Sequence, residues 1–220
     1  MYLLILLLGP TVMIYLGLQV LANVPITFLL FYSWLFLVPL LDLRFLQKKP
    51  WSDAIPAYGL ALQRKNLLIG SATGVLFLIV IIGAGSVFHP FLFDREDLIP
   101  LLERWHFSGN QAVWLIAILM FINPLLEELY WRGFMHHRLQ GRHGKATVVF
   151  LTALFYSLYH FLSVVPLFAW PFNVMMVAPV FIAGLIWGCM RQRDSTITGS
   201  VLSHILADVG IMSVYLLFLV

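Results

Sequence analysis

Charged residues are scarce in this sequence, and their scarcity limits the class of protein. Asp, Glu, Lys and Arg together make up 10% of its 220 residues, while 61% are hydrophobic. Soluble globular domains have roughly 25% charged and roughly 45–50% apolar residues, so the composition excludes a soluble globular domain. The formal net charge is only +3. Binding nucleic acid needs a concentrated basic face, and we therefore expect no nucleic-acid partner.

Cysteine and N-terminal basic residues are also lacking. The single cysteine, Cys189, excludes an internal disulfide. The chain begins MYLLILLLGP, with no basic residue before its apolar run. Because a cleaved signal peptide needs such a basic region, we expect this first segment to be retained as a helix.

What the sequence has in abundance is long apolar segments. Several uncharged stretches of about 20 residues are long enough to cross ~30 Å of hydrocarbon as helices. We expect an all-α, polytopic transmembrane bundle of about seven helices, with six to eight compatible with the pattern. The expected spans are 2–22, 27–43, 67–89, 111–136, 147–165, 172–190 and 197–219.

Basic residues indicate the orientation of these spans. Ten Lys and Arg residues fall in the loops 44–66, 137–146 and 191–196, and only Arg95 and Arg104 fall in loops of the other side. Cytoplasmic loops carry the excess of Lys and Arg, so the N-terminus is expected in the cytoplasm and the C-terminus outside it. The segment 52–65 is compatible with an amphipathic interfacial helix or an ordinary loop.

Ionisable residues inside the expected spans are the main functional signal. Insertion of an Asp or Arg at a helix centre costs roughly 2.5–3.5 kcal/mol, so such residues should face the bundle interior and mark a functional site. Three different spans place theirs at a similar depth, which predicts one cluster. The residues are Glu127, Glu128, Arg132, His160, His204 and Asp208.

Helical spacing suggests how the cluster is arranged. Glu128 and Arg132 are four residues apart, which favours an ion pair, and this pair is structural rather than catalytic in our interpretation. Glu127 is turned about 100° from Glu128 and is free to face a cavity. Asn123, one turn earlier, is placed to orient Glu127. The histidines of the following basic segment are expected to be solvated: His136, His137 and His143.

The cluster is suited to water activation. A buried carboxylate such as Glu127 would take a proton from water, His160 would assist and later donate it, and His204 would stabilise the oxyanion. A serine mechanism fits poorly because Ser203 and His204 are adjacent on a helix and diverge. The zinc motif H-E-x-x-H is absent. Two histidines with carboxylates are nevertheless compatible with a catalytic zinc site, for which the ligands would be Glu127, His160, His204 and Asp208.

Three motifs in separate spans resemble one family. The run Glu127–Arg132 (EELYWR) resembles the E-E-x-x-x-R motif of the CAAX protease and bacteriocin-processing (Abi) membrane family, which includes the type II CAAX prenyl endopeptidases. His160 is similar to the His of its F-x-x-x-H motif, and His204 with Asp208 to its third motif, His followed four residues later by Asn. The resemblance covers roughly 110–215. It implies a catalytic membrane core at 111–220 preceded by N-terminal transmembrane helices and loops at 1–110.

The resemblance also implies roles. Glu127 and His160 would activate water, His204 and residue 208 would form the oxyanion site, and Glu128 and Arg132 would support them. Two positions depart from the family pattern: Tyr156 stands where the motif has Phe, and Asp208 where it has Asn. Ionised Asp cannot donate a hydrogen bond, so Asp208 would have to be protonated, orient His204 or bind a metal.

The function that we predict is therefore an intramembrane endopeptidase of the glutamate type, compatible with CAAX-type C-terminal processing. Its partners would be a membrane-associated peptide or lipidated protein substrate and the lipid bilayer, and its location a prokaryotic plasma membrane. We expect no cofactor, with zinc left open. The alternatives are a non-catalytic immunity or scaffold protein of the same fold, and a proton-coupled transporter, which would favour internal repeats that the sequence lacks.

Overall fold

The structure is a computed structural model that describes residues 1–219, and within them it contains helices and no strand. The α-helices are α1 (Tyr2–Ile14), α2 (Val24–Leu41), α3 (Ala54–Tyr58), α4 (Arg64–Leu92), α5 (Arg95–Arg104), α6 (Gly109–Glu128), α7 (His136–Gln140), α8 (Lys145–Val164), α9 (Phe172–Met175), α10 (Val177–Asp194) and α11 (Thr198–Phe218). Short π- or 3-10 segments continue or precede some of them: η1 (Tyr15–Val20), η2 (Asp42–Leu46), η3 (Trp51–Asp53) and η4 (Leu129–Met135).

Seven continuous helical segments are long and apolar enough to span a membrane. They comprise Tyr2–Val20, Val24–Leu46, Arg64–Leu92, Gly109–Gln140, Lys145–Val164, Phe172–Asp194 and Thr198–Phe218. Each coincides with one of the seven expected spans, so the predicted polytopic helical bundle is confirmed. The fourth span continues through η4 and α7 to Gln140, beyond its expected end at residue 136. His136 and His137 therefore lie in a helix and not in a loop.

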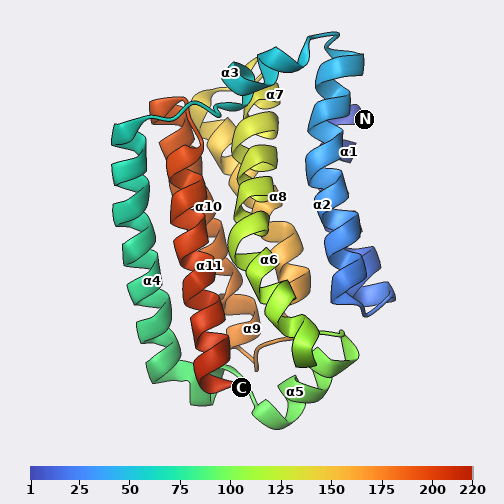
Figure 1. The fold of residues 1–220 in the computed structure, drawn as a ribbon, viewed down its shortest axis with the longest axis vertical. Coiled ribbons are helices and arrows are strands. Elements are labelled where there is room, and N and C mark those ends of the chain that lie inside the picture. Colours follow the sequence, from blue (N-terminus) through green and yellow to red (C-terminus); the bar gives the residue numbers. More distant parts are fainter. Residues whose placement is uncertain (220) are drawn as a thin grey trace.

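The helices pack side by side along the long axis of the bundle (Figure 1). α4 lies along α11, α8 lies along α10, and α6 packs against α11 and α2. Where α4 meets α11, a Cβ atom on Gly70 would collide with the backbone of Gly199, so glycine allows the two helices to approach closely. α1 starts at one end of the bundle and α11 finishes at the other (Figure 1), as an odd number of spans requires.

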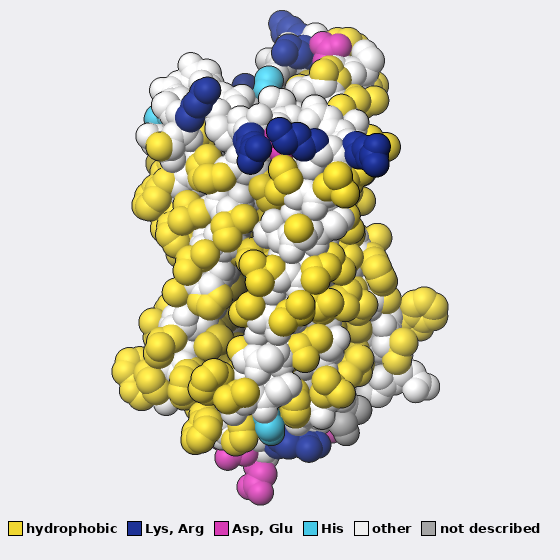
Figure 2. Space-filling view, turned by 90° about the vertical axis from the view of Figure 1, so that its left-hand side faces the viewer, with side chains coloured by type: hydrophobic (Ala, Val, Ile, Leu, Met, Phe, Trp, Pro, Cys, Tyr) yellow, Lys and Arg dark blue, Asp and Glu magenta, His cyan; other side chains and the backbone are white. Residues whose placement is uncertain are grey.

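The surface has the distribution of a membrane protein. Large hydrophobic side chains cover the sides of the bundle, while most Lys and Arg gather at one end and Asp and Glu occur at both ends (Figure 2). Many of these side chains are exposed in the isolated chain, among them Leu29, Ile79, Trp114 and Leu217. In water such a surface would be unstable, whereas lipid covers it. The chain is an integral, multi-pass membrane protein.

Two connecting segments differ from the expectations. In the segment 52–65 the helix α3 extends only from Ala54 to Tyr58 and ends at Gly59, which adopts a left-handed conformation (φ +71°). At the opposite end, the sequence reading missed α5. Its start is recognisable in retrospect, because the Asp94 side chain accepts a hydrogen bond from the Glu96 backbone N–H as a helix cap and the first turn is acidic.

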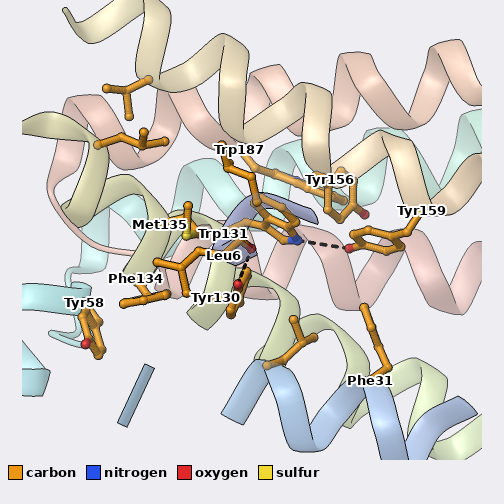
Figure 3. Packing of buried hydrophobic residues seen from close by; sticks show 14 of the residues in the cluster. Leu6, Phe31, Tyr58, Tyr130, Trp131, Phe134, Met135, Tyr156, Tyr159 and Trp187 are labelled. Atoms are coloured by element: carbon orange, nitrogen blue, oxygen red, sulfur yellow. Dashed lines mark hydrogen bonds between the residues drawn. The ribbon is translucent and has the colours of Figure 1, made fainter. Parts of the chain in front are cut away.

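An aromatic core connects the first two helices with the fourth and fifth spans (Figure 3). Tyr130 donates a hydrogen bond to the backbone carbonyl of Leu6 (2.6 Å), and Trp131 donates to the Tyr159 hydroxyl (3.3 Å). Both Tyr130 and Trp131 are fully buried, as expected of packing residues. They belong to η4, where the helix widens to a π-turn directly after Glu128. Single π-turns inside α-helices often occur at functional sites.

Candidate active site

The predicted site residues come from four elements. α6 supplies Asn123, Glu127 and Glu128, and η4 supplies Arg132. The others are Tyr156 and His160 from α8 and His204 and Asp208 from α11. All eight are buried or partly buried. The structure brings most of them into direct contact.

Glu128 and Arg132 form the ion pair that their spacing predicted. The Arg132 Nη1 atom lies 2.8 Å from the Glu128 Oε1 atom, and both side chains are fully buried. Arg132 Nη2 donates a second hydrogen bond to the Gly184 carbonyl on α10 (3.0 Å). The guanidinium carbon also lies 4.5 Å from the ring centre of Tyr156, a cation–π distance. The pair therefore joins the fourth, fifth and sixth spans.

His204 is the centre of the cluster. Its Nδ1 atom lies 3.3 Å from Glu128 Oε1, so the proton on Nδ1 faces a carboxylate. Its Nε2 atom faces three oxygens, at 3.4 Å from the Tyr156 hydroxyl, 3.5 Å from Glu127 Oε2 and 3.7 Å from Asp208 Oδ1. Contacts of this length are typical of catalytic groups without substrate. Nε2 is the nitrogen that is directed into the cluster.

Glu127 differs from Glu128 in its surroundings. Its side chain is only 2% exposed, and its Oε2 atom, like that of Glu128, is buried without a hydrogen-bond partner. The Tyr159 hydroxyl interacts with the same carboxylate. No Lys or Arg pairs with Glu127 among the described residues. A buried carboxylate oxygen that lacks a hydrogen-bond partner costs free energy, and such an oxygen is retained where it has a structural or functional reason.

Asp208 is held by a residue that the sequence assigned differently. Asn123 Nδ2 donates to Asp208 Oδ2 at 3.3 Å, whereas we had expected Asn123 to orient Glu127. The assignment was wrong because α6 packs against α11, and the Asn123 side chain reaches across this interface. Because Oδ2 accepts a hydrogen bond from the Asn123 amide, Asp208 Oδ1 remains available either to contact His204 or to carry a proton.

His160 lies beside the cluster, in its aromatic wall. Its Nδ1 atom is 2.8 Å from the Tyr156 carbonyl oxygen, so Nδ1 carries the proton and Nε2 of the neutral ring is a free acceptor. The ring centre lies 4.5 Å from those of both Tyr156 and Tyr159. The structure thus connects His160 to His204 through Tyr156, and to Glu127 through Tyr159. No ion pair between Glu127 and His160 occurs among the described residues.

The sequence did not indicate two further residues that contact the cluster. Trp187 of α10 stacks on His204, with ring centres 4.2 Å apart and planes 20° from parallel, and its Nε1 donates to the Ser203 hydroxyl (3.0 Å). No local pattern around Trp187 indicated this role. Tyr159 bridges Trp131 and Glu127, and its position next to His160 was the one available signal. Both residues restrict the rings that would carry out chemistry.

The basic segment after the cluster also required a correction. His136, expected to be solvated, is fully buried and its Nε2 is 2.8 Å from Gln192 Oε1. His137 is partly buried. The error follows from the extended fourth span, since a helix places these residues against α10 where a loop would have exposed them.

The sequence left open a zinc site formed by Glu127, His160, His204 and Asp208. Within residues 1–219, no group of three or more His, Cys, Asp and Glu side chains has an arrangement that could hold a metal ion.

Comparison with known proteins finds one matching family model. The family model described as type II CAAX prenyl endopeptidase Rce1-like matches residues 109–210. No curated protein and no solved structure matches the chain. The matched segment begins with α6, ends in α11 and contains every predicted site residue. Over residues 109–210 the chain is thus similar to the type II CAAX prenyl endopeptidase Rce1-like family.

Proposed function

We propose that this chain is an intramembrane endopeptidase in which Glu127 and His160 activate a water molecule for attack on a peptide bond. The observation that carries the proposal is the Glu127 carboxylate, buried beside His204 with no Lys or Arg partner among residues 1–219. Glu128 is ion-paired to Arg132 and so is a poor base. The division of labour between two adjacent carboxylates follows from their different surroundings.

The proposed reaction is simple hydrolysis. Glu127 removes a proton from water while the water oxygen bonds to the carbonyl carbon, and the carbonyl electron pair moves to oxygen. When the tetrahedral intermediate collapses, the carbon–nitrogen bond breaks. The proton taken from water passes to the leaving amine, with His160 as the donor, since its Nε2 is free to carry it. The products are a carboxylic acid and an amine.

The oxyanion would be stabilised on the α11 side of the cluster. His204 Nε2, protonated and surrounded by carboxyl groups, is directed toward the same space as Glu127 Oε2. In our proposal Asp208 is protonated on Oδ1, because Oδ2 already accepts from Asn123. A protonated carboxyl donates a hydrogen bond as an asparagine would. The Tyr156 hydroxyl, 3.4 Å from Nε2, positions the His204 ring.

We also infer the substrate class from the family description, which names prenyl endopeptidases. The substrate would be a protein whose C-terminus carries a prenylated cysteine followed by three residues. A buried site suits such a substrate, because the prenyl group can remain in lipid while the adjacent peptide bond reaches Glu127.

The proposed location is a prokaryotic plasma membrane, with the N-terminus in the cytoplasm. The charge bias supports this orientation, because ten Lys and Arg residues lie at one end of the bundle and two at the other. Accessibility of a peptide tag fused to each end, measured in intact and permeabilised cells, tests the orientation. Labelling of the N-terminal tag in intact cells would contradict it.

The activity is tested with purified protein and a fluorogenic peptide that ends in a farnesylated CAAX sequence. Glu127→Gln should lower kcat by 10²–10⁴-fold, the usual contribution of a general base, without changing the thermal midpoint by more than a few degrees. Glu103→Gln, an exposed acid of α5, is the matched control and should retain full activity. Equal cleavage by wild type and Glu127→Gln would refute the mechanism. Wild type that cleaves neither farnesylated nor unmodified peptides would favour a scaffold protein.

A further inference from the structure

A second polar site lies at the end of the bundle that carries the ten Lys and Arg residues, here called the basic end. A cavity of about 430 Å³ opens there between α3, α7 and α10. Its basic lining residues are Lys49, His137 and Arg191, with Asp53 as the one acid. None of these residues belongs to the Glu127 cluster, and the proposed peptidase reaction does not use them.

Arg191 forms the floor of this cavity, and its situation is unusual. The residue is only 6% exposed, yet no carboxylate pairs with it among residues 1–219. Its Nε donates to the Arg132 carbonyl (2.9 Å) and its Nη2 to the Ala57 carbonyl (3.2 Å), which leaves Nη1 without a hydrogen-bond partner. A buried guanidinium is normally paired with an anion.

The surrounding backbone holds the guanidinium in place. Gly59 packs directly on it, since a Cβ atom at that position would lie 2.8 Å from the Arg191 Cζ and Nη1 atoms. The Gly59 carbonyl accepts hydrogen bonds from the Ile197 backbone N–H (2.9 Å) and from the Thr196 hydroxyl (3.0 Å). These bonds tie the end of α3 to the start of α11. Backbone packing therefore fixes the position of the Arg191 guanidinium in the cavity wall.

The position of the cavity matches the headgroup layer. Lys49 follows the end of the second span, while His137 and Arg191 lie three residues before the ends of the fourth and sixth. Three residues of helix correspond to roughly 5 Å, so all three groups are within one turn of the helix ends. Basic pockets between transmembrane helices on the cytoplasmic side are typical binding sites for anionic lipid headgroups.

We propose that this cavity binds a phosphate group, with Arg191 as its central ligand and Lys49 and His137 at its rim, and that the phosphate belongs to an anionic phospholipid. Positive charge exceeds negative charge in the lining, and Arg191 Nη1 makes no hydrogen bond within residues 1–219. Guanidinium groups are well suited to phosphate oxygens. A bound headgroup would anchor α3, and through it the end of η4, at the membrane surface.

The experiment measures lipid binding to the purified full chain in neutral detergent. Phosphatidylglycerol is titrated while bound lipid is counted by native mass spectrometry, with phosphatidylcholine as the zwitterionic comparison. Lys49→Gln should weaken the apparent Kd for phosphatidylglycerol about fivefold, the equivalent of about 1 kcal/mol per basic residue near an anionic surface. Lys49→Glu should weaken it further. Lys48→Gln removes the same charge one residue away, outside the lining, and should leave the Kd unchanged.

A second arm separates the possible sources of the phosphate. Inorganic phosphate is added alone, and its effect on the thermal midpoint is compared between wild type and Lys49→Gln. If only phosphatidylglycerol gives a response that depends on Lys49, the ligand is a lipid; if inorganic phosphate gives it too, the site also accepts a soluble phosphate. Equal losses in Lys48→Gln and Lys49→Gln, or equal affinity for both lipids, would overturn the proposal, because general surface charge would then explain the binding.

Discussion

Replacing Glu128 by Gln tests the assignment of the two adjacent carboxylates. Glutamine keeps the shape of the side chain and its acceptor oxygen, so the change removes mainly the negative charge. Arg132 would lose its ion-pair partner at 2.8 Å while remaining fully buried. His204 would at the same time lose the carboxylate that faces its Nδ1 atom at 3.3 Å. We therefore expect loss of stability as well as loss of activity.

The size of the effect follows from burial. Removing one partner of a buried ion pair typically costs about 3–5 kcal/mol, because the other charge remains uncompensated. The amide oxygen of Gln can still accept from Arg132, and the Tyr156 ring still lies 4.5 Å from the guanidinium, so we expect a value near the lower limit. On the scale of soluble domains of similar size, about 3 kcal/mol corresponds to a decrease of roughly 6–12 °C in the thermal midpoint.

The assay is thermal unfolding of the purified protein in detergent, followed by cleavage of the farnesylated peptide well below the midpoint. Arg193→Gln is the matched control, since this exposed arginine lies 3.8 Å from Asp194 and an exposed pair contributes about 1 kcal/mol or less. Glu128→Gln should lower the midpoint clearly and Arg193→Gln should hardly change it. An unchanged midpoint with complete loss of cleavage would mean that Glu128, and not Glu127, is the catalytic base.

Two further substitutions restore the residues that the family motifs contain. Asp208→Asn should retain cleavage and move the pH optimum upward, because protonated Asp is a donor only at low pH whereas Asn donates at every pH; a pH profile with the wild-type optimum would exclude a protonated Asp208. Tyr156→Phe removes the hydroxyl 3.4 Å from His204 Nε2 and should lower kcat up to about tenfold, since one neutral hydrogen bond contributes about 0.5–1.5 kcal/mol. Single-turnover kinetics measures it, and an unaltered kcat would show that the hydroxyl does not position His204.

Local sequence was sufficient for the parts of the molecule that depend on neighbours along the chain. The seven spans were recognisable because each segment must be apolar by itself to cross hydrocarbon. The Glu128–Arg132 pair was predictable because residues four apart on a helix meet regardless of what surrounds them. The approach of His204 to the Glu127 and Glu128 carboxylates was predictable as a common layer, since helix rise converts residue number into depth.

Other features of the site depend on how the helices are rotated and packed, which no local pattern contains. Asn123 faces Asp208 because α6 packs against α11. Trp187 stacks on His204 only because α10 presents that face to α11. The Tyr156 hydroxyl, which the family motif lacks, gained a partner in His204 that is 48 residues away in the chain.

The sequence by itself determined the class of protein, the number of spans and the identity of the ionisable residues, because hydrocarbon imposes its requirements on each segment separately. Only the tertiary structure decided how the surroundings of the two adjacent carboxylates differ. Glu128 is held by Arg132 and His204, and Gly184 fixes Arg132 in place, whereas Glu127 has no arginine partner in the described part of the chain. These contacts come from three helices that are brought together by packing, and packing depends on all the side chains at once.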